Sequence, residues 1–308
     1  MNSQTNDNGE QFVFIVGIAR TGSKIYLSMI KRNTDIDIVN ELHYLTPWWV
    51  RSDFVSKAER QYGGLGTDQQ VTAFVNSLYS RTFQGSFWNQ NKDKGKPTNG
   101  IISIKKEVLL ERILRSNRTY KEILKIIIEE HAQSHDKTLG GAKFPVNIAC
   151  VPTLMYWFPK AKYIHLIRDP RAVYCSQLKK SLTRKMSSKY QAYYYQAKVL
   201  FYIYNQFKHA GRLHSRCQGE GNYHLSRFED VVGDPKPNMM SICDFLGVEM
   251  TEGMMKPNVV DSSYKKGNKE KGLDSSTLTE WTRHITPLTR QIINYLLKNE
   301  MAMFGYKM

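Results

Sequence analysis

The chain has 308 residues, of which 44 are lysine or arginine and 28 are aspartate or glutamate, so its formal net charge is +16. A hydrophobic content of 41% is enough for a packed core, which excludes a wholly disordered chain. No apolar run is long enough to span a membrane, and the first residues do not resemble a secretion signal. A cytoplasmic protein is therefore expected.

The first predicted elements form the opening of a β-α-β unit. Residues 12–16 (FVFIV) are a continuous apolar run and predict a buried strand of a parallel sheet. Residues 17–23 (GIARTGS) predict a loop, residues 24–31 a helix, and residues 36–39 a second strand. This order is typical of an α/β protein.

The next part of the chain is less regular. Residues 43–66 are aromatic and irregular in pattern, and residues 91–100 predict a polar loop. Further predicted elements are helices over 68–81 and 120–132, a strand over 139–143, and a helix that ends at Trp157.

The last part of the chain continues the α/β pattern. The predicted elements are a buried strand over 163–167, two helices within 171–212, a strand over 223–226, a helix over 235–246 that Gly247 ends, a polar loop over 262–279, and a helix over 286–303. We expect a flexible N-terminus at 1–11, followed by a single domain over 12–308. The predicted fold class is α/β, a P-loop-like parallel sheet flanked by helices, with helical elaborations.

Positive charge gathers in the middle of the chain, and the cysteines are scattered. Residues 101–200 hold 19 basic and 7 acidic residues, which suits a solvated face, a field that attracts a highly charged ligand, or a nucleic-acid surface. Composition alone does not distinguish these three interpretations of the positive charge. The four cysteines show no CxxC pair and no spacing typical of metal ligands, so reduced thiols and no metal ion are expected.

The glycine loop at 17–23 suits phosphate binding, because a strand-to-helix turn presents free N–H groups and the positive end of the helix dipole. Its spacing misses the nucleotide triphosphatase pattern GxxxxGK[ST]. Lys24 is displaced by one position, and no Ser or Thr follows it to bind Mg²⁺. Phosphoryl transfer with magnesium is therefore disfavoured, and Arg20 is placed to supply the positive charge.

Two strand-to-helix segments, at residues 17–23 (GIARTGS) and 163–176 (YIHLIRDPRAVYCS), resemble motifs of the PAPS-dependent sulfotransferases. Residues 17–23 resemble the 5′-phosphosulfate loop in its arginine form, as in Golgi-type and bacterial members. Residues 163–176 (YIHLIRDPRAVYCS) resemble the strand-loop-helix that binds the 3′-phosphate. Shorter matches include KFP at 143–145, LSRFEDV at 225–231 and FLG at 245–247. The resemblance covers about residues 12–308, except the stretch 43–135.

The resemblance implies a sulfotransferase that uses 3′-phosphoadenosine 5′-phosphosulfate (PAPS) without a metal ion and releases 3′-phosphoadenosine 5′-phosphate (PAP). Arg20 would stabilise the leaving phosphate, and Lys143 would steady the sulfuryl group. The implied nucleotide-binding residues are Thr21, Gly22, Ser23, Lys24, Arg168, Ser176, Phe228, Lys265, Lys266 and Gly267. A second late basic segment, Lys271-Gly272, is an alternative to the last three.

Two residues are candidates for the catalytic base. The family's cytosolic members place a histidine two residues after the lysine, but Pro145 occupies that position here. Glu41 lies where tyrosylprotein-type members carry a catalytic glutamate, and His43 is the alternative. The expected acceptor is a small aromatic or apolar molecule with a hydroxyl, or an amine, with no nucleic-acid partner. Two rival functions stay open: a P-loop kinase, and a non-catalytic polyanion-binding protein.

Overall fold

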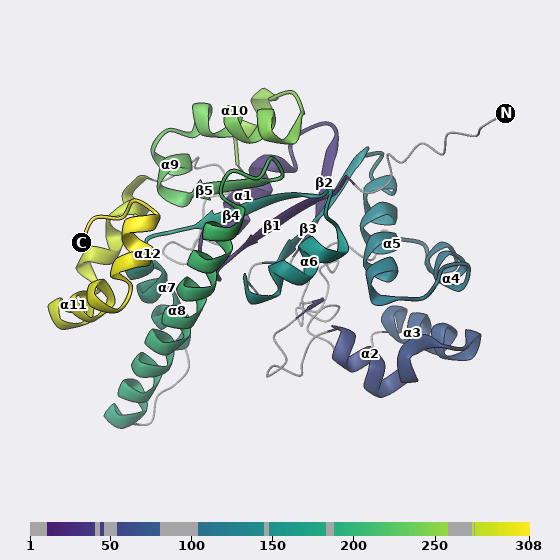
Figure 1. The fold of residues 1–308 in the computed structure, drawn as a ribbon, viewed down its shortest axis with the longest axis horizontal. Coiled ribbons are helices and arrows are strands. Elements are labelled where there is room, and N and C mark those ends of the chain that lie inside the picture. Colours follow the sequence, from purple (N-terminus) through teal and green to yellow (C-terminus); the bar gives the residue numbers. More distant parts are fainter. Residues whose placement is uncertain are drawn as a thin grey trace. The chain divides into compact units, whose positions relative to one another are not determined.

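The computed structural model describes residues 11–40, 44–45, 54–80, 104–144, 148–182, 188–257, 273 and 275–308. Within these ranges five strands form one sheet in the order β2-β3-β1-β4-β5 (Figure 1). Their bounds are Val13–Gly17 (β1), Ile36–Val39 (β2), Leu139–Phe144 (β3), Lys162–Ile167 (β4) and Tyr223–Arg227 (β5). The pairs β2/β3 and β4/β5 are parallel, as the sequence predicts.

The chain divides into two compact units. The first comprises residues 1–15 and 34–162, and the second comprises residues 16–33 and 163–308, so the boundary falls within β1. The helices of the first unit are α2 (Phe54–Tyr62), α3 (Asp68–Tyr79), α4 (Lys106–Leu114), α5 (Tyr120–Gln133) and α6 (Val151–Trp157).

Buried phenylalanine side chains form the part of the first unit's core that lies beside its strands. Phe12, Phe14 and Phe158 are buried, and the rings of Phe12 and Phe158 meet edge to face with their centroids 5.4 Å apart. Phe144, at the end of β3, packs against Phe14 with a centroid distance of 5.8 Å. In the same unit, helix α5 packs on β2 and β3 through its buried isoleucine and leucine side chains.

The second unit contains the two strands β4 and β5 and the helices around them. In Figure 1, α10 and α8 lie on opposite sides of these strands. The helices are α1 (Ser23–Ile30), α7 (Pro170–Leu182), α8 (Lys189–Cys217), α9 (Phe228–Gly233), α10 (Pro235–Leu246), α11 (Pro287–Leu296) and α12 (Lys298–Met303). The hydroxyl groups of Tyr26 on α1 and Ser226 on β5 are hydrogen-bonded to each other, which ties the first helix to the last strand.

Three sequence expectations are wrong or incomplete. Residues 54–62 form α2 instead of an irregular segment, with Ala58 fully buried. Helix α4 was not expected. The single helix expected over 286–303 is two helices, because the buried Leu297 takes φ −112° and ψ 19°, which is not helical. Residues 1–10 of the N-terminus predicted to be flexible (1–11) and the predicted loop at 91–100 lie outside the described residues.

Candidate functional site

The glycine loop joins β1 to α1 and leaves the start of the helix open. Gly22 is the N-cap residue, with φ 83° and ψ 12°, and no side chain caps the helix. No acidic residue occupies the first turn of α1. The N–H groups of that turn and the helix dipole therefore favour an anion at this position.

Arg20 has a backbone conformation that is uncommon for a residue with a side chain. Its φ is 77°, in the left-handed region. Such a conformation costs about 1–3 kcal/mol and persists only where surrounding contacts hold it. The loop supplies one of those contacts within itself, since the buried Thr21 donates its hydroxyl hydrogen to the carbonyl of Ile18 at 2.8 Å. The next two residues differ in exposure: Ser23 is half-buried and Lys24 is exposed.

The two motifs come together in the second unit. The Nε of Arg20 donates to the Oγ of Ser176 on α7 at 2.9 Å. Arg168, which directly follows β4, donates from Nη1 to the carbonyl of Arg20 at 3.4 Å and from Nη2 to the carbonyl of Thr277 at 3.1 Å. Ser176 and Arg168 are both buried. Two guanidinium groups and a serine hydroxyl thus surround the loop that opens α1.

The ring of Phe228 packs against the guanidinium of Arg168 in this cluster. Phe228 is the first residue of α9, is 2% exposed, and carries the guanidinium of Arg168 4.1 Å above its ring centroid. An arginine in this position is fixed by a cation–π contact and by carbonyl groups, so its positive charge stays available to an anion. The prediction that Phe228 contacts the nucleotide stays a prediction.

A second layer of contacts fixes the segment that follows β4. Arg171 forms a buried ion pair with Asp169 at 2.6 Å, donates to the carbonyl of Lys307, and stacks over the ring of Trp281. The N–H of Asp169 donates to Glu229 at 2.9 Å. These bonds hold the backbone that aims Arg168 at the loop.

Glu229 joins this network to the end of the chain. Tyr306 donates its hydroxyl to Glu229 at 2.9 Å. Burial raises the pKa of Glu229, while the bonds from Asp169 and Tyr306 and the charge of Arg168 oppose the rise. The resemblance includes LSRFEDV at 225–231 only as a sequence pattern. The structure shows that Glu229 in this segment accepts a hydrogen bond from the N–H of Asp169, the residue after Arg168.

Sequence reasoning did not select Tyr202, which lies against the glycine loop. Its phenol is buried beside the backbone of Ala19, and burial raises its pKa to about 12. The phenol is therefore neutral near pH 7 and can only donate or accept a hydrogen bond there. The tyrosine-rich character of residues 190–204 was the available signal, but it does not show which tyrosine faces the loop.

The remaining predicted residues are Lys143, in the first unit, and a set that lies outside the described residues. Lys143 is the fifth residue of β3, in the first unit, and its side chain is fully buried. Glu41, His43, Lys265, Lys266 and Gly267 lie outside the described residues, as does Lys271. The assignment of Glu41 as the base, with His43 as the alternative, stays a prediction.

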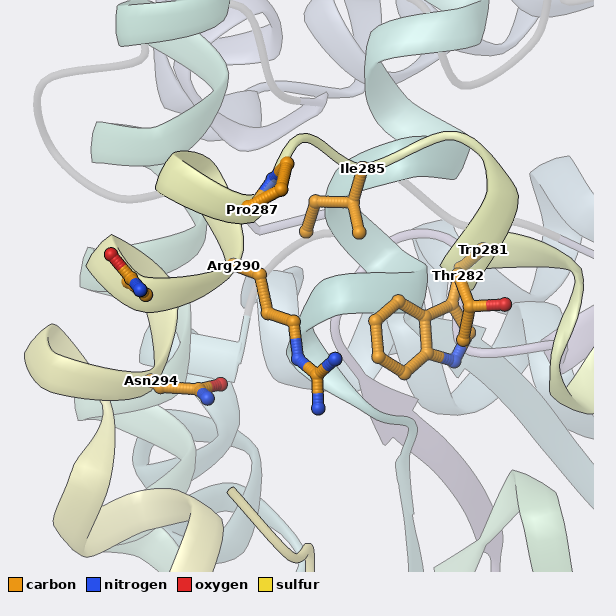
Figure 2. Close-up of a pocket in the computed structure, with 7 residues that line it drawn as sticks. Trp281, Thr282, Ile285, Pro287, Arg290 and Asn294 are labelled. Atoms are coloured by element: carbon orange, nitrogen blue, oxygen red, sulfur yellow. The ribbon is translucent and has the colours of Figure 1, made fainter.

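A separate cavity of about 380 Å³ lies in the C-terminal part of the second unit. Figure 2 shows the guanidinium of Arg290 between the ring of Trp281 and the amide of Asn294, with Ile285 and Pro287 above. The Trp281 ring also carries Arg171, so this tryptophan is a packing residue of the C-terminal segment.

Comparison with known proteins agrees with this geometry. A family model described as the sulfotransferase family matches residues 12–252. This chain belongs to the sulfotransferase family, and it is an enzyme that transfers a sulfuryl group to an acceptor. No curated protein matched the sequence significantly.

Solved structures of low sequence identity share the fold. The sulfotransferase domain of the Synechococcus PCC 7002 olefin synthase has a TM-score of 0.61 and 18% identity, over 100% of this chain and 98% of that one. A sulfotransferase domain from the curacin biosynthetic pathway gives 0.57 and 17%, over 97% and 98%. Sulfotransferase STF9 from Mycobacterium avium gives 0.52 and 12%, over 97% and 78%. In the described part of the chain, no helix is long and apolar enough to cross a membrane.

Proposed function

We propose that this sulfotransferase uses PAPS as its donor and transfers the sulfuryl group to a hydroxyl, or an amine, of a small aromatic or apolar acceptor. The observation that carries the proposal is the hydrogen bond between Arg20 and Ser176. It joins the loop suited to a 5′-phosphate to the helix suited to a 3′-phosphate. A donor with phosphates at both ends of one ribose matches that juxtaposition.

The nucleotide's two ends would be held by different groups. The N–H groups of the first turn of α1, with Thr21, Gly22, Ser23 and Lys24, would bind the 5′-phosphate. Arg168 and Ser176 would bind the 3′-phosphate. Phe228 and the segment Lys265-Lys266-Gly267 complete the proposed nucleotide site.

The transfer needs negative charge to be stabilised as it develops. PAPS supplies the sulfuryl group. The acceptor oxygen forms a bond to sulfur while the bond from sulfur to the bridging oxygen breaks, and that electron pair stays on the phosphate of PAP. Arg20 can donate two bonds to the oxygens that gain charge, and the loop needs no metal ion for this task. Lys143 is proposed to steady the sulfuryl oxygens.

The acceptor must also lose a proton. Glu41 is the proposed base, with His43 as the alternative. The proposed enzyme is cytoplasmic, which agrees with its four cysteines, none of which forms a disulfide. We expect neither nucleic acid nor a metal ion as a partner in the reaction.

Thermal unfolding with nucleotides tests the donor assignment. PAP should raise the melting temperature of the tag-free protein, with or without EDTA, and ATP should do so only weakly. A P-loop kinase would instead respond to ATP and Mg²⁺, and a non-catalytic polyanion-binding protein would respond to heparin but not to PAP. Equal stabilisation by ATP, or loss of the PAP effect in EDTA, contradicts the proposal.

A further inference from the structure

A cluster of potential metal ligands lies in the first unit. Within the described ranges, the carboxylate of Asp37 and the imidazoles of His131 and His135 bring one ligand atom each to within 4.8 Å of one another. The Oδ2 of Asp37 lies 3.3 Å from the Nε2 of His131 and 2.7 Å from the Nδ1 of His135. Asp37 and His131 are buried, while the His135 side chain is 42% exposed.

The packing of α5 on the sheet creates this convergence. Asp37 on β2 is the register partner of Gly140 on β3. A β-carbon at Gly140 would lie 2.8 Å from the Cγ2 of Ile128 and 3.3 Å from the β-carbon of Ala132, both on α5. The absence of a side chain at Gly140 therefore lets the last turns of α5 approach the strand next to Asp37.

The chain after α5 is held in place by several hydrogen bonds. The N–H of His135 donates to the carbonyl of Ala132 at 3.1 Å. The Nδ1 of His135 also lies 3.0 Å from the carbonyl of His131. Lys137 then donates from Nζ to the carbonyl of Thr34 at 2.6 Å, which ties this turn to the segment before β2. The spacing of His131 and His135 by four residues places both rings on one face of the helical segment.

The geometry is close to that of a zinc site. Zinc binds histidine nitrogen and carboxylate oxygen at about 2.0–2.2 Å, so neighbouring ligand atoms in a tetrahedron lie about 3.3 Å apart. The pair of Asp37 and His131 already has that separation. The N–H of Ile38 donates to the other carboxylate oxygen of Asp37 at 2.7 Å, and such a bond fixes the orientation of a ligating carboxylate.

We propose that Asp37, His131 and His135 bind one divalent transition-metal ion of the zinc class, with water in the fourth position. His135 closes the site, since its exposed ring can turn to replace its hydrogen bond to Asp37 with a bond to the metal. Two imidazoles and one carboxylate favour zinc over magnesium or calcium, which prefer oxygen ligands. The ion ties the end of α5 to β2.

The proposed metal site lies wholly within the first unit, because Asp37 is the second residue of β2 and the two histidines come from α5 and the turn that follows it. None of its three residues has a part in the proposed transfer. The proposed role of the ion is to link β2 to the end of α5.

Zinc titration of the tag-free protein, stripped with a chelator and dialysed, tests the proposal. Competition with a chromophoric chelator should give one Zn²⁺ per chain, and Zn²⁺ should raise the melting temperature. His135→Gln is the main variant because the residue is partly exposed, and it should weaken binding about tenfold or more. Asp37→Asn should do the same, with folding checked by circular dichroism.

His284→Gln is the matched control, since His284 is an exposed histidine 3.8 Å from the carboxylate of Glu280 without a third ligand nearby in the described structure. It should leave zinc binding unchanged. Co²⁺ should give the visible spectrum of a nitrogen and oxygen site without a thiolate band. No binding at one ion per chain, or binding that His135→Gln and Asp37→Asn do not weaken, would show that these residues form only a hydrogen-bonded cluster.

Discussion

The phenyl ring of Phe228 occupies the space that a β-carbon on Gly22 would need. A β-carbon at Gly22 would lie 2.2 Å from the Cδ2 of Phe228, closer than any real contact. The loop residue and the first residue of α9 therefore fit together only because Gly22 has no side chain. The same ring carries Arg168 on its face, so the shape of the loop and the position of that arginine depend on each other.

The first prediction is that Gly22→Ala disrupts the site by two separable effects. The substitution forces alanine to φ 83°, at a cost of about 1–2 kcal/mol, and adds the clash with Phe228. Gly64→Ala is the matched control, because Gly64 also has φ 83° but nothing within 4 Å of the added β-carbon. Gly22→Ala should lower the free energy of unfolding by more than Gly64→Ala and should weaken PAP binding, whereas Gly64→Ala should not. Denaturant unfolding and calorimetry give the two measurements. Equal losses in both variants would mean that the ring moves aside freely.

The second prediction concerns Arg20 and its partner Ser176. Arg20→Ala should lower turnover at saturating PAPS by about a hundredfold or more, since removal of one preorganised donor to developing charge has that effect. Ser176→Ala should give a smaller loss. Arg115→Ala, an exposed arginine paired with Glu111, is the control for loss of a positive charge. Near-normal turnover of Arg20→Ala would remove the arginine from the proposed chemistry.

The third prediction separates the two phosphate sites. Arg168→Gln should weaken binding of PAP much more than binding of adenosine 5′-phosphate, because only PAP carries the 3′-phosphate. Calorimetric titration of both nucleotides against both proteins measures the difference. A parallel loss for both ligands would assign Arg168 to the packing of Phe228 and the loop instead of to the 3′-phosphate.

The fourth prediction assigns the proton transfer. Glu41→Gln should abolish most of the turnover while PAP still binds, and His43→Asn should reduce it less, because the base must reach the attacking oxygen. Both variants are compared at saturating PAPS with an acceptor found by screening phenols and hydroxylated aromatic compounds. The reverse order of effects would make His43 the base.

The fifth prediction concerns acid stability. His165 is fully buried, accepts or donates a 2.6 Å bond with the hydroxyl of Tyr223, and has its pKa lowered by burial from 6.5 to about 3. The unfolded chain binds a proton below its ordinary pKa, but the folded chain does not. The free energy of unfolding should therefore decrease as pH falls from about 6.5 towards 3, by up to about 1.4 kcal/mol per pH unit from this group.

Comparing slopes isolates the contribution of His165. His165→Phe removes the titrating group, while Tyr223 keeps His214 as a partner at 3.2 Å. Its unfolding free energy should depend less steeply on pH between about 6 and 4 than that of the unaltered protein. His284→Gln controls for loss of an exposed imidazole. If the unfolding free energy depended on pH equally in the unaltered protein, His165→Phe and His284→Gln, His165 would be protonated in the folded state.

Local patterns were enough to predict the parts of the fold that depend on neighbouring residues. The apolar run before Gly17 predicted β1, and the sequence around Arg168 predicted a strand followed by a helix, which are β4 and α7 in the structure. The resemblance led to Arg20, Arg168 and Ser176, which the structure brings together.

Features that depend on distant contacts could not be predicted in the same way. Leu297 interrupts the last predicted helix where it is buried, and its sequence neighbours do not indicate this. Tyr202 on α8 lies beside the backbone of the glycine loop. Other tyrosines on the same helix, such as Tyr190 and Tyr193, are exposed, so the sequence does not indicate which one contacts the loop. Asp37 lies on β2 and His131 on α5, so no local sequence pattern indicates that the two side chains meet.

The position of β1 in the sheet has a consequence for how the chain folds. Of the described strands it comes first in the chain, but it is the central one in the order β2-β3-β1-β4-β5. Its neighbours in the sheet, β3 and β4, begin at Leu139 and Lys162. During synthesis more than a hundred further residues must therefore be added before this apolar strand can pair with either neighbour. Contacts this distant in sequence slow folding and expose the nascent chain to aggregation. We expect refolding from denaturant to be slow and its yield to fall with increasing protein concentration.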